Sequence, residues 1–186
     1  MFNEESYREV GQTEVKRVIN TNRDITSRLF ANKLVLSYSV AEGDFSVGGE
    51  YSYSRRKNLY VVLPTGVMDD ENNLIKENMT SVFVDYSRQI AKLSLQLGLR
   101  YEHVDFNYYE HDVRVDAQSK RYADWFPSFA LSFPVNKVQM QLAYASNISR
   151  PSYQMLRSGV QYDNRVTYES GNPFLLPSIS RNLSYS

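Results

Sequence analysis

The sequence predicts an all-β protein: an antiparallel up-and-down sheet that crosses a membrane as part of a transmembrane β-barrel. Three features support this: two-residue alternation of apolar residues, segments long enough to span a bilayer, and connections that are alternately long and short. The clearest alternation lies in residues 92–105. On a strand, one face of that segment would carry Leu93, Leu95, Leu97, Leu99 and Tyr101. About ten such residues, tilted near 45°, rise roughly 23 Å, the height of the apolar band of an outer-membrane barrel.

Composition narrows the class of protein. The 21 basic and 21 acidic residues cancel, so charge gives no reason to expect a nucleic-acid partner. No apolar run approaches the eighteen or so residues that a spanning helix needs, which excludes a helical membrane protein but not a barrel, whose strands are diluted by lumen-facing polar residues. The chain has no cysteine. Residues 1–10 do not resemble a secretory signal, so we expect the N-terminus of an exported form to lie elsewhere.

The first half of the chain predicts one clear hairpin and two further strands. Residues 7–20 are heavily charged and do not alternate cleanly, but they are a candidate for a further strand. Residues 27–40 and 45–55 alternate clearly and are joined by a tight turn at 41–44. Residues 56–77 contain Pro, Gly and an acidic run at 69–73, which predicts a long polar connection. A strand at 78–87 follows, in which Phe83 breaks the alternation, and a short turn at 88–91 leads into residues 92–105.

The second half continues the same order of long and short connections. A polar connection is predicted at 107–120, a hairpin of strands 122–133 and 138–146 with its turn at 134–137, and a last strand at 179–186 after about thirty intervening residues. An up-and-down outer-membrane barrel needs short periplasmic turns and long external loops. We therefore expect 69–73, 107–120 and 163–170 outside, and 41–44 and 134–137 in the periplasm. Alternation itself is shared by soluble antiparallel sheets.

Candidate chemical sites are few. His103 and His111 lie among acidic residues but without a metal-ligand spacing, and the acidic run 69–73 lacks the spacing of a calcium loop. No Ser/His/Asp arrangement can be assigned, so we expect no catalytic residue, no metal and no cofactor. The run Arg55-Arg56-Lys57 leaves two interpretations open: a grip on lipopolysaccharide phosphates, or charge that ends a strand just outside the apolar band.

Four short motifs, in order, resemble one protein family. Residues 144–153 read Y-A-S-N-I-S-R-P-S-Y and residues 171–177 read G-N-P-F-L-L-P. Together with L-R-Y-E at 99–102 and Y-x-x-x-F-P-S at 122–128, they resemble the barrels of TonB-dependent receptors, particularly the Bacteroidetes outer-membrane β-barrel family. The resemblance spans about residues 30–186. Ser178, where an acidic residue often follows the last motif, and the missing N-P-F after Tyr153 bear on ligand choice more than on fold.

This resemblance implies a cell outer-membrane protein of a Gram-negative bacterium and a role in transport. Residues 1–186 would form one barrel segment, about 7–8 strands of a 22-stranded receptor, with 1–26 its least regular part and the plug domain absent from this chain. The implied function is active uptake of a scarce ligand, with outer-membrane lipid around the barrel and TonB acting through the plug. The ligand, whether siderophore, vitamin, glycan or peptide, stays open.

Candidate ligand or lumen contacts are Tyr108, Tyr109, Arg150 and Tyr153. The alternative function is a surface or soluble β-domain that binds glycans or proteins through aromatic loops, and a weaker one is a small barrel enzyme. Membrane partitioning separates the first two, since only the receptor interpretation places Leu93, Leu95 and Leu97 in lipid.

Overall fold

The structure, a computed structural model, describes residues 2–7, 17–63, 70–164 and 167–186. The elements in these ranges are all strands: β1 (Phe2–Tyr7), β2 (Arg17–Val40), β3 (Gly43–Leu63), β4 (Glu71–Ile90), β5 (Leu93–Glu110), β6 (Val113–Arg114), β7 (Lys120–Val135), β8 (Val138–Ser149), β9 (Val160–Asn164), β10 (Thr167–Ser170) and β11 (Ser178–Tyr185). The main sheet runs β1-β2-β3-β4-β5-β7-β8-β11, with β6 beside β5, while β9 and β10 pair separately. Every pair is antiparallel, so the predicted fold class is confirmed. Within the described ranges, no helix is long and apolar enough to span a membrane.

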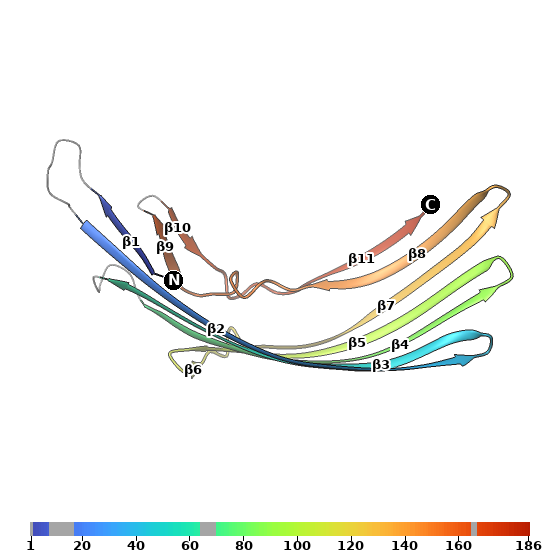
Figure 1. The fold of residues 1–186 in the computed structure, drawn as a ribbon, viewed down its shortest axis with the longest axis horizontal. Helices are drawn as coiled ribbons and strands as arrows, with labels where there is room; N and C mark the ends of the chain where they lie inside the picture. The colour runs from blue at the N-terminus through green and yellow to red at the C-terminus, as the bar shows by residue number, and fades with distance from the viewer. Residues whose placement is uncertain (1, 8–16, 64–69, 165–166) are drawn as a thin grey trace.

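The main sheet is a curved trough whose tight turns gather at one end (Figure 1). Two-residue turns at 41–42, 91–92 and 136–137 join β2 to β3, β4 to β5 and β7 to β8. Ala41, Glu42, Ala91 and Asn136 have φ between 51° and 58°, the left-handed conformation that two-residue hairpin turns require. The turns predicted at 41–44 and 134–137 are thus confirmed but shorter, and the one predicted at 88–91 lies slightly later.

The strand register gathers the alternating apolar side chains on the convex face of the trough. Leu95 pairs with Leu131, and Leu131 pairs with Leu142, so apolar residues of three strands form one row. Many of these side chains are exposed, among them Leu34 at 67%, Trp125 at 61% and Leu183 at 68%. Towards the tight turns, the concave face carries mainly small and polar residues, such as Gly98, Ser128 and Ala130. The predicted division of the sheet into two faces is confirmed.

Phe83, which breaks the alternation of its strand, lies on the concave face. It pairs with Gly48, and the Lys33 Nζ atom lies 5.3 Å from the centroid of its ring. A Cβ atom added to Gly48 would clash with this ring and would lie 2.6 Å from the backbone oxygen of Leu34. Gly48 therefore provides the space in which Phe83 covers the sheet.

The strands are longer than predicted. β3 reaches Leu63 and β4 begins at Glu71, so much of the polar connection predicted at 56–77 is strand, although 64–69 lie outside the described residues. β5 extends to Glu110 and turns through residues 111–112 into β6, where a connection was predicted over 107–120. The prediction failed because beyond the apolar band both faces of a sheet can be polar: alternation disappears while backbone pairing continues.

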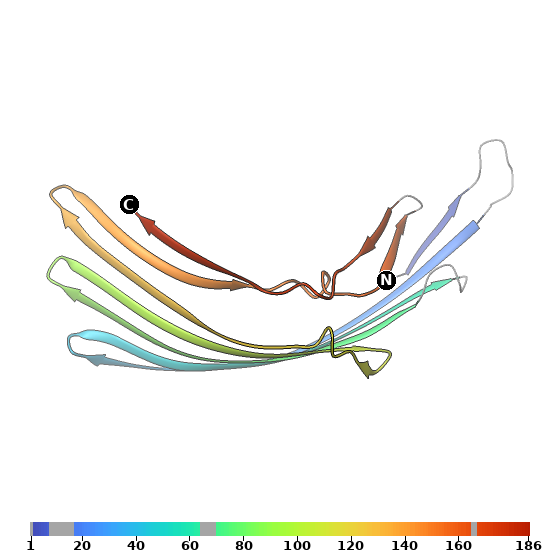
Figure 2. The same ribbon diagram turned by 180° about the vertical axis from the view of Figure 1, so that it is seen from behind.

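Two further segments differ from expectation. Of the irregular stretch 7–20, Tyr7 belongs to β1 and residues 17–20 to β2, whereas 8–16 lie outside the described residues. Residues 150–164 and 167–177, named here the returning segment, lie on the concave side of the trough (Figures 1 and 2). This segment includes β9 and β10. A cluster of buried apolar side chains joins it to the sheet.

Candidate functional site

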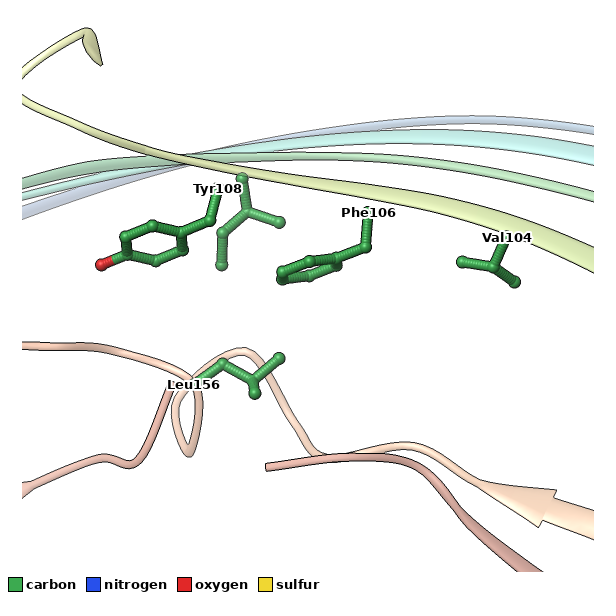
Figure 3. Packing of buried hydrophobic residues seen from close by; sticks show 5 residues of the cluster. Val104, Phe106, Tyr108 and Leu156 are labelled. Carbon is green, nitrogen blue, oxygen red and sulfur yellow. The ribbon is translucent and has the colours of Figure 1, made fainter. Parts of the chain in front are cut away.

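The side chain of Leu156 packs the returning segment onto the main sheet, which is called the wall below. Leu156 belongs to one buried apolar cluster with Ile75, Val104, Phe106 and Tyr108 of β4 and β5. Figure 3 shows Leu156 facing the part of the sheet from which Phe106 and Tyr108 project. Val104 and Tyr108 have no exposed surface, and Leu156 is 6% exposed. The Tyr108 hydroxyl is 2.9 Å from the Ser158 Oγ atom, so a hydrogen bond accompanies the apolar contact. The segment thus has a defined position over the lumen.

The sequence contains a signal for this seat that periodicity reasoning missed. Apolar side chains in β5 occupy odd positions up to Leu99 and Tyr101, then even positions at Val104, Phe106 and Tyr108. Since alternate residues of a strand face opposite sides, this switch means that burial changes from the convex to the concave face. Ending the predicted strand at residue 105 hid the switch, because Phe106 and Tyr108 then fell outside it.

Arg150 is fixed at the start of the returning segment by two side chains of the wall. Its Nε atom donates a hydrogen bond to the Tyr122 hydroxyl at 3.1 Å, and its guanidinium forms an ion pair with the buried Glu102. Glu102 also accepts a hydrogen bond from Arg100 Nε at 2.6 Å. Burial alone would lower the pKa of Arg150, but the hydrogen bonds to Tyr122 and Glu102 outweigh it and raise the pKa. Arg150 is therefore a charged, oriented group.

Tyr153 joins the returning segment to β3 and β4. Its hydroxyl lies 2.7 Å from Ser54 Oγ and donates to Glu77 Oε1 at 3.4 Å, while the Arg56 guanidinium carbon lies 5.8 Å from the ring centroid. Burial raises the pKa of Tyr153, and the carboxylate of Glu77 acts in the same direction. The phenol is therefore held as a hydrogen-bond donor.

These groups line a cavity of about 360 Å³ between the wall and the returning segment. Its lining residues are Arg56, Glu77, Arg150, Pro151, Ser152, Tyr153 and Gln154. Two guanidinium groups, a carboxylate, a phenol and an amide in one concave space can bind a polar ligand through several hydrogen bonds. The volume lies at the lower end of the range for small-molecule sites.

The four candidate contacts divide into two pairs. Arg150 and Tyr153 both line the cavity, as just described. Tyr108 lies beneath the returning segment without exposed surface. Tyr109, one residue later, points to the opposite face, where Lys76 Nζ lies 4.8 Å from its ring centroid. Sequence reasoning missed Arg56, although its even position in β3 assigns it to the concave face.

A second group of polar side chains joins the far part of the returning segment to the wall. Glu71, 3% exposed, accepts hydrogen bonds from Asn73 and, at 3.4 Å, from Gln161 Nε2. Arg157 contacts Glu169 Oε2 at 3.2 Å within the segment itself. Among the residues described, no group of three or more His, Cys, Asp or Glu side chains is placed to hold a metal ion.

Comparisons with known proteins agree with this geometry. A model of the outer membrane protein beta-barrel family matches residues 1–186. The ferric citrate transporter FecA is similar over 79% of this chain and 24% of its own, with 14% identity and a TM-score of 0.51. The alcaligin outer-membrane receptor FauA from Bordetella pertussis is similar over 90% of this chain and 27% of its own, with 10% identity and a TM-score of 0.53.

At such identities the two solved structures show the fold alone. That fold is the one expected from the resemblance to receptor barrels, so the expectation is confirmed at the level of the barrel wall. The chain spans about a quarter of the length of each of these structures. No curated protein sequence matches it.

Proposed function

The chain belongs to the outer membrane protein beta-barrel family, and from this premise we propose that it forms part of the wall of a TonB-dependent receptor that takes up a scarce ligand. It is located in the outer membrane of a Gram-negative bacterium. The observation that carries the proposal is the division of one sheet into an exposed apolar convex face and a polar concave face crossed by the returning segment. No catalytic step forms part of the proposal.

The convex face supports a lipid environment. Leu34, Leu36, Tyr38 and Val40 of β2 are all exposed, as are apolar residues of the neighbouring strands. A soluble or surface β-domain would place this continuous apolar face in water, where large exposed patches promote association. The receptor interpretation places it against acyl chains.

The main sheet has two open edges, which supports the proposal that further strands close the barrel. Within the described residues, β1 and β11 each have only one neighbour in the main sheet. Unpaired backbone groups in hydrocarbon cost several kcal/mol each, so an open sheet is not stable in a bilayer. Residues 1–186 form, in this proposal, a single segment of a barrel whose other strands and plug lie outside them.

Short side chains line the lumen near the tight turns, which is consistent with a separate domain filling the interior there. A hollow of about 460 Å³ lies there, and small residues such as Gly98, Ser128, Ala130, Ala143 and Ala145 contribute to its lining. Small barrels fill their interior with their own side chains. Side chains this short leave room for a plug, through which TonB would act.

The proposed ligand contacts are Arg150 and Tyr153, together with Arg56 and Glu77. They lie at the loop end of the lumen, which the receptor interpretation assigns to the cell exterior. The two guanidinium groups favour a ligand that carries anionic or hydroxyl groups. Siderophores, vitamins, glycans and peptides all include such molecules.

Uptake measurements in cells test the proposed transport. A strain lacking the complete gene and a strain lacking TonB are compared with their parent for uptake of labelled ferric siderophores, cobalamin, oligosaccharides and peptides. We expect one ligand class to be lost in both strains and restored in the first by the gene. Uptake that depends on the gene but not on TonB would contradict energised transport.

A variant pair tests the proposed contacts. Arg56→Gln should weaken binding of that ligand by roughly 10- to 150-fold, since a charge-assisted hydrogen bond contributes roughly 1.5–3 kcal/mol. Lys137→Gln, which removes the same charge in the turn between β7 and β8, should leave binding unchanged. Equal affinities of the two variants would exclude Arg56 from the site.

The proposal that the barrel closes outside residues 1–186 has its own test. The isolated 186-residue chain is refolded in detergent micelles, and heated and unheated samples are compared by gel electrophoresis. We expect aggregation or a species without heat-dependent mobility, because the curvature belongs to a wider cylinder. A compact, heat-modifiable, protease-resistant monomer would show that the chain closes alone.

A further inference from the structure

Three cationic side chains of three neighbouring strands form one row across the convex face, each directly opposite the next. Arg28 of β2 pairs with Arg55 of β3, and Arg55 pairs with Lys76 of β4. Residues that are directly opposite have Cβ atoms about 4.5–5.5 Å apart, and like charges in this arrangement are destabilising. An anion between these three side chains, named here the basic row, would therefore relieve their repulsion.

The surrounding convex positions supply no such anion. The residues two positions before and after each member along its strand are Thr26 and Phe30, Tyr53 and Lys57, and Leu74 and Asn78. Within the described part of the chain, Arg28 and Arg55 form no ion pair. The nearest carboxylates on this face are Asp24, four residues from Arg28, and Asp105, which binds Arg121 at 2.8 Å.

The basic row lies just beyond the apolar band. Phe30 pairs with Tyr53, and the rings of Phe30 and Tyr51 are 6.5 Å apart, so aromatic side chains mark the edge of the band next to the row. Arg28 and Arg55 are each two residues further along their strands. Two residues on a tilted strand rise roughly 5 Å. The headgroup layer on each side of the hydrocarbon is about 5–7 Å thick, so Arg28 and Arg55 lie at the height of the headgroups.

We propose that the basic row binds the phosphate of a glycolipid in the outer leaflet, the lipid A part of lipopolysaccharide. The row combines charge complementarity with continuity to the lipid-facing band. Arg56 points to the lumen, so the sequence run Arg55-Arg56-Lys57 contributes only its first and last residues to this face, and Lys57 extends the row outward by one step. Lys76 Nζ lies 4.8 Å from the centroid of the Tyr109 ring, so an aromatic side chain of β5 flanks the basic row on the side away from Arg55.

The choice of lipid rests on the orientation in the proposed function, which assigns the loop end to the cell exterior. A phosphate at the other leaflet would belong to a phospholipid instead. Binding of lipid A by the basic row does not depend on ligand uptake, so the two proposals fail separately. Uptake can be intact in a variant that has lost the lipid.

Lipid binding by the complete protein tests the proposal. The protein is delipidated in detergent, and its binding of bisphosphorylated lipid A, phosphate-free lipid A and phosphatidylglycerol is measured by native mass spectrometry. The variant Arg55→Gln/Lys76→Gln removes two charges of the row. Its matched control, Arg88→Gln/Lys92→Gln, removes two charges at the opposite end of the sheet.

We expect the unaltered protein and the control to bind bisphosphorylated lipid A at least about tenfold more tightly than phosphate-free lipid A, since each basic residue near an anionic surface contributes roughly a fivefold gain. The row variant should lose most of this preference while keeping its heat-modifiable mobility. Equal binding of the two lipid A forms by the unaltered protein would overturn the proposal without any substitution. So would tighter binding of phosphatidylglycerol, or a preference that survives in the row variant.

Discussion

Replacing Leu156 with alanine should release the returning segment from the wall. The side chain is 6% exposed and belongs to one cluster with four buried residues of β4 and β5. Leucine-to-alanine changes in cores cost about 2–5 kcal/mol, and a small cluster beside an open lumen belongs at the low end of that range. A loss of about 2–3 kcal/mol raises the population of the open segment by roughly 30- to 150-fold.

Hydrogen exchange followed by mass spectrometry measures this opening in the complete protein in detergent. The reporters are two amides of the segment: Met155 N–H donates to Ser152 O at 2.9 Å, and Asn172 N–H donates to Met155 O at 2.6 Å. Their exchange should accelerate by the same factor as the open population grows. The control Leu176→Ala alters a side chain that is 69% exposed and should change exchange little. Unchanged exchange in Leu156→Ala, or equal acceleration in both variants, would refute the packing argument.

Three further predictions address the wall itself. Leu95→Arg, in the lipid-facing band, should cost about 2–4 kcal/mol and impair membrane assembly, whereas Gln96→Arg should be tolerated; equal tolerance would refute the facing. An epitope inserted at 111–112, the exposed turn between β5 and β6, should be labelled on intact cells and one inserted at 41–42 should not, and the reverse result would invert the orientation. Gly48→Ala should destabilise the barrel by about 1–3 kcal/mol because its Cβ meets backbone, while Gly49→Ala, with its nearest atom at 3.7 Å, should not; heat-modifiability on gels compares the two.

The apolar band was predictable from sequence because lipid imposes a strict rule on it. Leu95 and Leu97 must face acyl chains, and their neighbours must not, so two-residue alternation reports the face directly. The tight turns were predictable for a related reason: they end the same alternating segments. Phe83 was the exception, since its place on the concave face depends on the missing side chain of Gly48, a residue of another strand.

The outer half of the wall and the candidate site were largely hidden. Asn58, Glu71 and Asn73 are buried polar residues, and only the covering segment makes them so. The bond between Ser54 and Tyr153 joins residues 99 positions apart, which no local pattern reports. Arg150 and Tyr153 were found through a motif rather than through periodicity, and Arg56 would have been found by following strand parity past residue 55.

The most direct test of the central claim, a wall with lipid on its convex face and lumen on its concave face, is a nitroxide scan of the complete protein in lipid vesicles. The chain has no cysteine, so single cysteines at Leu95, Gln96, Ala130, Leu131, Gln141 and Leu142 can be labelled without background from these residues. These positions are adjacent residues on three neighbouring strands. We predict high collision rates with oxygen at the three leucines, and with a polar nickel complex at Gln96, Ala130 and Gln141. Equal collision rates at adjacent positions, or the opposite alternation, would contradict the claim.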